Sequence, residues 1–404
     1  LPSPKELRSP VTAVGHDGDG TAVTVSADSK LRVWDAKWDS DDWQLKKQRD
    51  GSDAVFDHEY PTSSVRILRL ETASRRDLGG THALLWNKKS LPRLVSLDTG
   101  KPYELTAPDE ETFFSYMDIY DNNGKGWRAV GCSAGPPQVM IWDLSAEPRE
   151  DNGPVLQLPH HDTVNFVEIF SKGRRALTCC KDWTLHVWNV DVQGDQSNGC
   201  MDVKLRHIAE LSGHEGKVNS CVVLRGGKSA LSCSDDGTMR IWDISDGWKE
   251  QRCRQILRSE AALEADSVRT GIWARQPGDD QDDIERVQSL DKELRLRADA
   301  KELRREFGSK DLAGDKKDDK KYAERVLRSS IILRQGRPMP SGSELDGMVG
   351  DLQQCWRELK QGAIRRCAVF TKSHTAVSCH NDGKMRVWDL ADGECFMTLE
   401  GHTE

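Results

Sequence analysis

The side chains of this chain that could do chemistry together are histidine, aspartate, hydroxyl and tryptophan residues at fixed separations. His214 lies 22 positions before Asp236, Asp236 lies six before Trp242, and a hydroxyl at Ser232 or Ser234 falls between them on one strand face. Such groups can form a chain of hydrogen bonds, because each offers the next a donor or an acceptor. At half-buried sites this chemistry is structural: each bond contributes about 0.5–1.5 kcal/mol, and losing one member leaves its partner unsatisfied.

The same separations recur in three other parts of the chain. His160 lies 22 positions before Asp182, and Asp182 lies six before Trp188. Two further Asp-Trp pairs keep the separation of six, but Glu6 and Lys360 take the place of their histidine. The spacing predicts four polar sets: His214, Ser232, Asp236 and Trp242; His160, Thr178, Asp182 and Trp188; Ser26, Asp28 and Trp34; and Ser378, Asp382 and Trp388.

Short strands and tight turns must hold these residues. The stretch 211–243, LSGHEGKVNSCVVLRGGKSALSCSDDGTMRIWD, contains three alternating runs separated by RGGK and DDG. Runs of this length with glycine-containing turns predict three antiparallel strands. A sheet this small is stable only when neighbouring sheets cover its apolar side chains. We therefore expect several such sheets packed on one another.

With Gly-His near its start and Trp-Asp at its end, the stretch 211–243 resembles one blade of the WD-repeat β-propeller family. The resemblance implies radial antiparallel sheets whose faces are buried by neighbouring blades. In that family, a hydrogen-bonded chain of His, turn Asp, strand Ser or Thr, and Trp ties the turns of one blade together. The resemblance thus gives the four polar sets the role of structural tetrads.

Other segments are weaker copies of the same unit. The stretch 64–105 alternates like a blade but lacks a Trp-Asp pair, and the stretch 113–143 has Pro136 where the turn aspartate should stand. We count the first of these as a degenerate blade, because a gap would leave two sheet edges unpaired. The stretch 364–389 is a further copy, and the chain then stops at a Gly-His pair, Gly401 and His402.

The predicted fold is an all-β WD-repeat β-propeller of about six to seven blades, with a charged α-helical insertion between two blades. Residues 1–257 would hold the first five blades, 258–362 the charged helical and partly disordered insertion, and 363–404 a further blade with the start of the next. Because the chain lacks an initiator methionine and ends on a Gly-His pair, we expect a fragment and an imperfectly closed ring.

The sequence does not indicate a binding site for a metal or a cofactor. The stretch DNNGKG has glycine where a calcium loop needs it, but Lys125 and Cys132 fall at ligand positions, so a strand connection is the better interpretation. The run His160-His161-Asp162 could ligate a metal, although repeat spacing already explains its first histidine. Eleven cysteines include no CxxC spacing, so zinc is not expected, and their use as small apolar strand residues favours a reducing compartment.

Composition and motifs argue against several function classes. A formal net charge of −8 argues weakly against broad nucleic-acid or anionic-membrane binding. No run approaches the roughly 18 apolar residues of a membrane span, and the N-terminus is not a signal peptide. Phosphate-binding glycine loops, GxSxG and HExxH are absent, so no catalytic residues and no small-molecule substrate are assigned. We expect an intracellular protein, cytoplasmic or nuclear, that is not an enzyme.

The resemblance implies a scaffold that binds other proteins through the turns of its blades. Trp183 replaces the glycine expected after a turn aspartate, and His380 leads into the next such turn, so both are predicted partner-binding residues. Trp183 could instead cap the neighbouring blade. Arg32, Arg240 and Arg386 recur two positions before tryptophan, which indicates a structural, solvated face.

The helical insertion provides the alternative function. Its apolar positions recur every three to four residues among dense mixed charge, which is typical of helices that pack back on the protein or dock to another helix. The stretch KELRLRADAKELRREFGSK is locally basic, so the insertion could recruit an acidic partner or RNA. Phe307 is the single aromatic residue of that stretch, and this argues against base stacking.

Overall fold

The computed structural model describes residues 10–16, 20–36, 43–48, 52–57, 64–70, 80–87, 91–107, 112, 114–124, 126–133, 136–144, 153–190, 192–194, 201–203, 206–246, 252–260, 262–263, 343, 346–347, 350, 361–370 and 374–401. Contacts within the chain define two compact units, residues 1–176 with 189–206 and residues 177–188 with 207–404. Within the described residues, the strands of each unit form small sheets.

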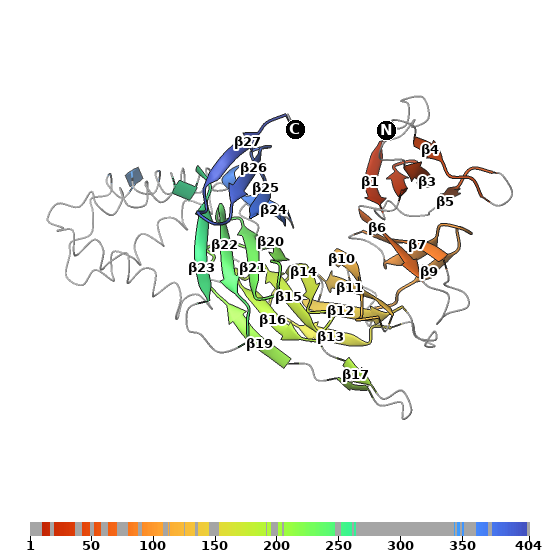
Figure 1. Ribbon diagram of the computed structural model, residues 1–404, viewed down its shortest axis with the longest axis horizontal. Helices are drawn as coiled ribbons and strands as arrows, with labels where there is room; N and C mark the ends of the chain where they lie inside the picture. The colour runs from red at the N-terminus through yellow and green to blue at the C-terminus, as the bar shows by residue number, and fades with distance from the viewer. Residues whose placement is uncertain are drawn as a thin grey trace. The chain divides into compact units, whose positions relative to one another are not determined.

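Three sheets of the first unit have strands that follow chain order (Figure 1). The first consists of β1 (Val11–His16), β2 (Thr21–Ser26), β3 (Lys30–Ala36), β4 (Trp43–Leu45) and β5 (Val55–Asp57), which also pairs with β3. The second consists of β6 (Ser64–Leu70), β7 (Gly80–Trp86), β8 (Arg93–Ser96) and β9 (Pro102–Glu104). The third consists of β10 (Phe114–Asp121), β11 (Trp127–Ser133), β12 (Gln138–Asp143) and β13 (Leu156–Pro159).

Alternating side chains along these strands fill two cores. Leu85 of β7 packs in a cluster with Val33 and Val65, whereas the preceding Leu84 packs with Met117 and Trp142. Successive residues of a strand point to opposite faces, so β7 contributes to a core on each side. The sheet in the degenerate stretch 64–105 is therefore buried on both faces, although it lacks a Trp-Asp pair.

A further sheet has the strand order β14-β15-β16-β19. Its strands are β14 (Val164–Phe170), β15 (Arg175–Cys180), β16 (Leu185–Asn189) and β19 (Arg206–Leu211). A two-stranded ribbon of β17 (Val192–Gly194) and β18 (Met201–Val203) lies in sequence between β16 and β19. The outer strand of this sheet therefore follows a longer connection than in the other sheets.

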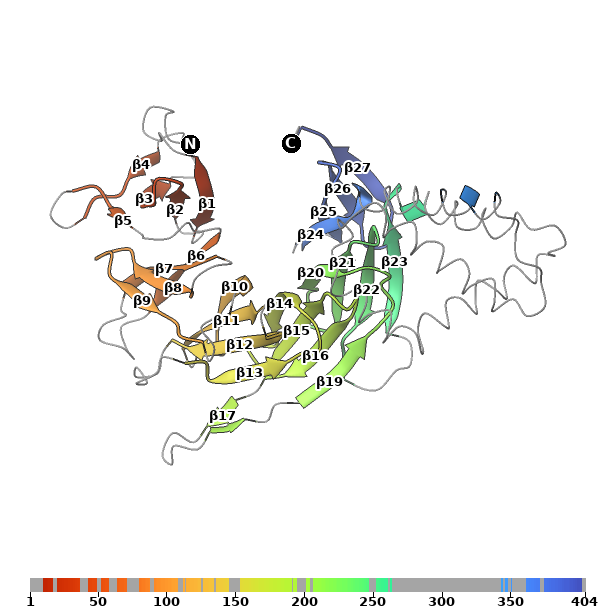
Figure 2. The same ribbon diagram turned by 180° about the vertical axis from the view of Figure 1, so that it is seen from behind.

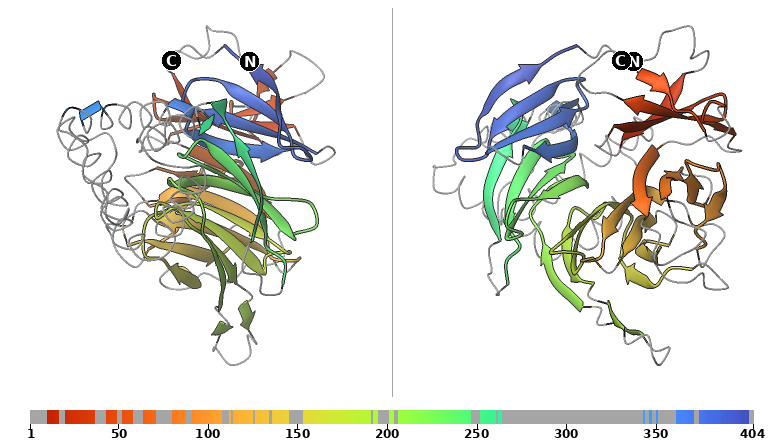
Figure 3. Two further views of the ribbon diagram at one scale, coloured as in Figure 1. Left: turned by 90° about the vertical axis from the view of Figure 1, so that its left-hand side faces the viewer. Right: turned by 45° about the vertical axis from the view of Figure 1, so that its right-hand side comes forward.

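Two more sheets of the second unit lie side by side (Figure 2). They consist of β20 (Val218–Val223), β21 (Ser229–Ser234), β22 (Thr238–Asp243) and β23 (Cys253–Arg258), and of β24 (Ile364–Val369), β25 (Thr375–His380), β26 (Met385–Asp389) and β27 (Cys395–Leu399). Leu231 and Met239 of the first sheet share a core with Ile364 and Trp388 of the second. Figure 3 shows the second of these sheets in blue. In its strand order, β27 pairs with β26 and is the last strand.

The pairing register repeats from sheet to sheet. The first strand of four sheets has an irregularity just after its first residue, at Val11, Phe114, Val218 and Ile364. In four sheets a small alanine stands opposite the central tryptophan, in the pairs Ala22 and Trp34, Ala129 and Trp142, Ala230 and Trp242, and Ala376 and Trp388. An indole needs this space because interiors are close-packed. The repetition confirms the prediction of an all-β chain built from blade-like sheets, six of which have four or more strands within the described residues.

The predicted helical insertion 258–362 lies almost entirely outside the described residues. Its described positions at 260, 262 and 263 and at 361 and 362 are helical. Within the described part of the chain, no helix combines the length and apolar character needed to traverse a lipid bilayer. The imperfect closure of the ring stays a prediction.

Candidate functional site

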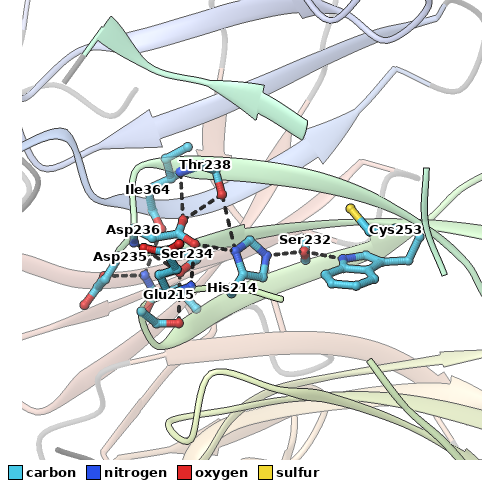
Figure 4. A network of polar contacts seen from close by, with 12 residues as sticks. His214, Glu215, Ser232, Ser234, Asp235, Asp236, Thr238, Cys253 and Ile364 are labelled. Carbon is cyan, nitrogen blue, oxygen red and sulfur yellow. Dashed lines mark hydrogen bonds and ion pairs between the residues drawn. The ribbon is translucent and has the colours of Figure 1, made fainter. Parts of the chain in front are cut away.

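The turn of the β20–β23 sheet contains a chain of buried polar side chains (Figure 4). His214 Nδ1 lies 2.8 Å from Asp236 Oδ2, and His214 Nε2 lies 2.7 Å from Ser232 Oγ. The indole N–H of Trp242 donates to the same Ser232 oxygen at 2.7 Å. Of the two candidate serines, Ser232 is therefore the one that links His214 and Trp242 by hydrogen bonds. Ser234 instead forms hydrogen bonds with backbone groups of the same turn.

The surroundings of His214 and Asp236 determine the protonation state of each side chain. Burial lowers the pKa of His214, so its ring is neutral at neutral pH. Nδ1–H then donates to Asp236, and the Ser232 hydroxyl donates to Nε2. Burial by itself raises the pKa of Asp236, but His214 and Arg240 beside it and the backbone N–H of Glu215 hold it well below its usual range. Asp236 is therefore an anion whose oxygens accept several hydrogen bonds.

Thr238 completes the turn of the same sheet. Its backbone N–H and its hydroxyl both donate to Asp236 Oδ1, at 2.9 and 2.7 Å. The backbone N–H of Glu215 donates to Oδ2 at 2.9 Å. One carboxylate thus joins the segment that carries His214 to the turn between β21 and β22, and it fixes the shape of this surface turn.

The β24–β27 sheet builds the same chain with a histidine from another position. Trp388 Nε1–H donates to Ser378 Oγ at 2.7 Å, and that oxygen lies 2.7 Å from His380 Nε2. His380 Nδ1 lies 3.2 Å from the Gly362 carbonyl, and the residue is only 7% exposed. This burial contradicts the prediction that His380 belongs to a partner-binding surface. The ring is buried because it occupies the place that His214 fills in the neighbouring sheet.

In the first sheet, the spacing rule selected the wrong hydroxyl. Trp34 Nε1–H donates to Thr24 Oγ1 at 2.8 Å, whereas the predicted Ser26 accepts from Arg32 at 3.2 Å. Thr24 stands ten positions before its tryptophan, as Ser232 and Ser378 do. Side chains ten and eight positions before the tryptophan share a strand face, so alternation alone does not separate them. The separation of ten is the signal that identifies the bonded hydroxyl.

The sheet of Trp188 also uses the hydroxyl ten positions earlier. Trp188 Nε1–H donates to Thr178 Oγ1 at 3.3 Å. The turn aspartate, Asp182, accepts from the N–H and hydroxyl of Thr184 at 3.1 and 2.6 Å. For the predicted histidine of this set, His160, the structure gives an Nδ1 contact of 2.9 Å with the Leu158 carbonyl.

The tryptophan of the β10–β13 sheet has a different acceptor. Cys132 stands ten positions before Trp142, where the sheets of Trp34, Trp188, Trp242 and Trp388 have a hydroxyl. The indole N–H donates instead to the Thr106 carbonyl at 2.9 Å. A buried indole N–H is costly without an acceptor, so a neighbouring backbone segment replaces the missing side chain.

Two of the three repeated arginines are ion-paired rather than solvated. Arg32 Nη2 lies 2.8 Å from Asp28 Oδ2, and Arg386 Nη2 lies 2.7 Å from Asp382 Oδ2. The exposed fractions of the two arginine side chains are 14% and 8%. The prediction of a solvated basic face is therefore wrong at these positions, because each guanidinium neutralises the carboxylate of its own turn.

Trp183 occupies a backbone conformation that glycine normally takes. Its φ is 73°, and the equivalent turn residues Gly237 and Gly383 have φ of 73° and 76°. A side chain in this left-handed region meets its own backbone, at a cost of roughly 1–2 kcal/mol. The indole is neither fully buried nor fully exposed. The structure thus places the predicted partner-binding tryptophan on a strained, partly exposed turn beside Asp182.

Comparison with known proteins agrees with this repeated geometry. A family described as "WD domain, G-beta repeat" matches residues 4–35, 152–189 and 205–243. The chain therefore contains WD repeats. The three matched WD repeats end at or just after Trp34, Trp188 and Trp242, the tryptophans that donate to Thr24, Thr178 and Ser232.

Curated relatives of this WD-repeat chain share limited segments with it. The chain is 35% identical over 72 residues to the small ribosomal subunit protein RACK1 of Caenorhabditis elegans, covering 18% of this chain and 21% of that protein. It is 24% identical over 187 residues to the methylosome protein WDR77 of Xenopus laevis, covering 46% and 48%. It is 31% identical over 121 residues to the nuclear distribution protein PAC1 of Candida tropicalis, covering 29% and 21%. The matches thus span less than half the length of each relative.

Proposed function

We propose that this WD-repeat chain is a non-catalytic platform on which other proteins assemble inside the cell, and that the turn of Trp183 is part of its binding surface. The backbone conformation of Trp183 is the observation that supports a binding role for this turn. A bulky residue at φ 73° is an outlier, and its equivalents are glycines in the two following sheets. Strained residues of this kind cluster at functional sites.

The chemistry of the side chain fits a role in protein binding. Tryptophan is enriched among residues that dominate interface energies, because it combines a large apolar surface with one N–H donor. Asp182 and Thr184 bond to each other on either side of Trp183 and hold the turn in one shape. A side chain presented on a rigid turn loses little conformational entropy when a partner binds.

The names of two relatives support protein partners. One is a small ribosomal subunit protein and another is a methylosome protein, so both are named as members of assemblies. We extend this to the present chain: its partners are other proteins, and its blades position binding turns without taking part in a reaction. The alternative role for residues 258–362 in recruiting a partner stays a prediction.

A pair of glycine substitutions tests the role of Trp183. Trp183→Gly removes the indole and relieves the left-handed strain, so the fold is retained while partner binding is lost. Lys172→Gly is the matched control, because Lys172 is exposed on another turn at φ 59°. Affinity capture from an extract of the source organism, followed by quantitative mass spectrometry, would compare both variants with the wild type.

The expected result is a set of proteins that the wild type and the Lys172 variant capture and that the Trp183 variant loses. Circular dichroism and urea unfolding of each variant verify that the fold persists. Capture of the same proteins in the same amounts by the Trp183→Gly variant would show that this turn is not the binding surface.

A further inference from the structure

Three potential metal ligands converge where β15 turns into β16. One ligand atom each of Cys180, Asp182 and His186 lies within 4.8 Å of the other two. Cys180 and His186 are buried, at 0% and 8% exposure, and Asp182 is partly exposed. Among the described residues this is the group that combines a thiol, a carboxylate and an imidazole at such separations. Thiol and imidazole ligands together are typical of zinc sites.

In three other sheets an arginine occupies the position that His186 has in this sheet. The residue two positions before the tryptophan is Arg32, Arg240 or Arg386 in three sheets, but it is His186 in the sheet of Trp188. In two of those sheets the arginine forms an ion pair with the turn aspartate, at 2.8 and 2.7 Å. His186 has no such permanent charge. A bound cation would give Asp182 the positive neighbour that arginine gives to the other turn aspartates.

The residues around His186 are arranged to orient its ring. His186 Nδ1 lies 3.0 Å from His207 Nε2, and His186 Nε2 lies 3.0 Å from Thr184 Oγ1. The Thr184 hydroxyl donates to Asp182 at 2.6 Å. Metal-binding histidines commonly use their second ring nitrogen for such an outer hydrogen bond, which fixes the tautomer and the ring plane. Here Thr184 lies between His186 Nε2 and Asp182 and contacts both, while His186 Nδ1 contacts His207.

We propose that Cys180, Asp182 and His186 bind a divalent metal ion of the zinc class. Binding forms one bond each from Cys180 Sγ, an Asp182 carboxylate oxygen and His186 Nε2, and the thiol releases its proton to solvent. The proton of the His186 ring moves from Nε2 to Nδ1, from where it forms a hydrogen bond to His207 Nε2, and His207 carries its own proton on Nδ1. Zinc–ligand bonds are about 2.0–2.3 Å long, so the three ligand atoms move closer together and Thr184 gives up its contact with Nε2. Water fills the remaining position.

The sequence did not single out this group, because its spacing is C-x-D-x-x-x-H and lacks a CxxC pair. The strand-turn-strand geometry brings the three side chains together. Cys180 and His186 come from strands that flank the turn, and Asp182 comes from the turn itself.

Metal titration of the full chain tests the proposal. Apo protein is titrated with Zn²⁺ by calorimetry and with Co²⁺ by absorption spectroscopy, where a thiolate ligand produces an intense near-ultraviolet band. We expect one equivalent of either ion and a thiolate band for the wild type. Cys180→Ala abolishes the band, while Cys179→Ala retains it. Cys179 is the matched control because it is equally buried and is the neighbouring residue of the same strand.

Two further variants keep the test decisive if a cysteine variant fails to fold. His186→Arg introduces the residue found in three other sheets, so the fold is retained while metal binding is lost. His207→Gln is expected to weaken Zn²⁺ binding about 10–100-fold without removing the thiolate band. The proposal is overturned if the wild type binds no Zn²⁺ or Co²⁺ at one equivalent, or if folded Cys180→Ala or His186→Arg protein binds them as tightly as the wild type.

Discussion

The buried ring of His380 makes the stability of this protein depend on pH. Burial and the charge of Arg386 lower the pKa of His380 to about 4, against the opposing effects of the Gly362 carbonyl and Asp382. An imidazole in an unfolded chain has a pKa of about 6.5. Below about pH 6.5 the unfolded chain binds a proton at this imidazole, whereas the imidazole in the folded protein stays neutral until the pH approaches 4. The contribution of His380 is therefore fully present above about pH 6.5 and is lost as the pH falls towards 4.

The size of the effect follows from these two values. With pKa values of about 6.5 unfolded and about 4 folded, the free energy of unfolding falls by about 2 kcal/mol between pH 8 and pH 5 through this one group. Burial also lowers the pKa of His214, so His214 shifts the stability in the same direction. A substitution at His380 is needed to separate its contribution to the pH dependence of stability from that of His214.

Urea unfolding followed by tryptophan fluorescence measures this share. His380→Gln keeps a polar side chain beside Ser378 but does not titrate, so its stability should change by about 2 kcal/mol less than that of the wild type between pH 8 and pH 5. His374→Gln is the matched substitution on an exposed position just before β25. If His380→Gln and His374→Gln show the same dependence on pH, the buried ring does not titrate as the structure implies.

Three substitutions test the geometry of the blades by urea unfolding. Ser232→Ala leaves the indole N–H of Trp242 and a histidine nitrogen without partners, so it should destabilise the protein by about 2–4 kcal/mol, while Ser232→Thr, which keeps the hydroxyl, should lose much less. Ala230→Leu pushes a larger side chain against Trp242 and should cost about 1–3 kcal/mol, and a neutral result would show that the paired alanine provides no needed space. Trp183→Gly should raise the free energy of unfolding by about 0.5–1 kcal/mol, because relief of left-handed strain exceeds the entropy cost of glycine, and a loss of stability would contradict the strain argument.

The sequence alone determined the class of the fold and the positions of the strongest repeats. Alternating runs, glycine turns and the fixed separation of Asp236 from Trp242 are local patterns, and strand periodicity and turn chemistry act over a few residues. Those patterns also identified the buried tryptophans. They narrowed the bonded hydroxyl of this blade to two serines on one face without choosing between them.

Only the tertiary structure decided which neighbour satisfies each buried group. Ser26 and Thr24 share a strand face, and the position of Trp34 in the paired strand selects Thr24. His380 replaces a histidine that in another sheet comes from a segment 18 residues before the hydroxyl, because a hydrogen bond requires proximity in space and not a fixed separation in sequence. The pairing of strands, which no local pattern records, determined these contacts.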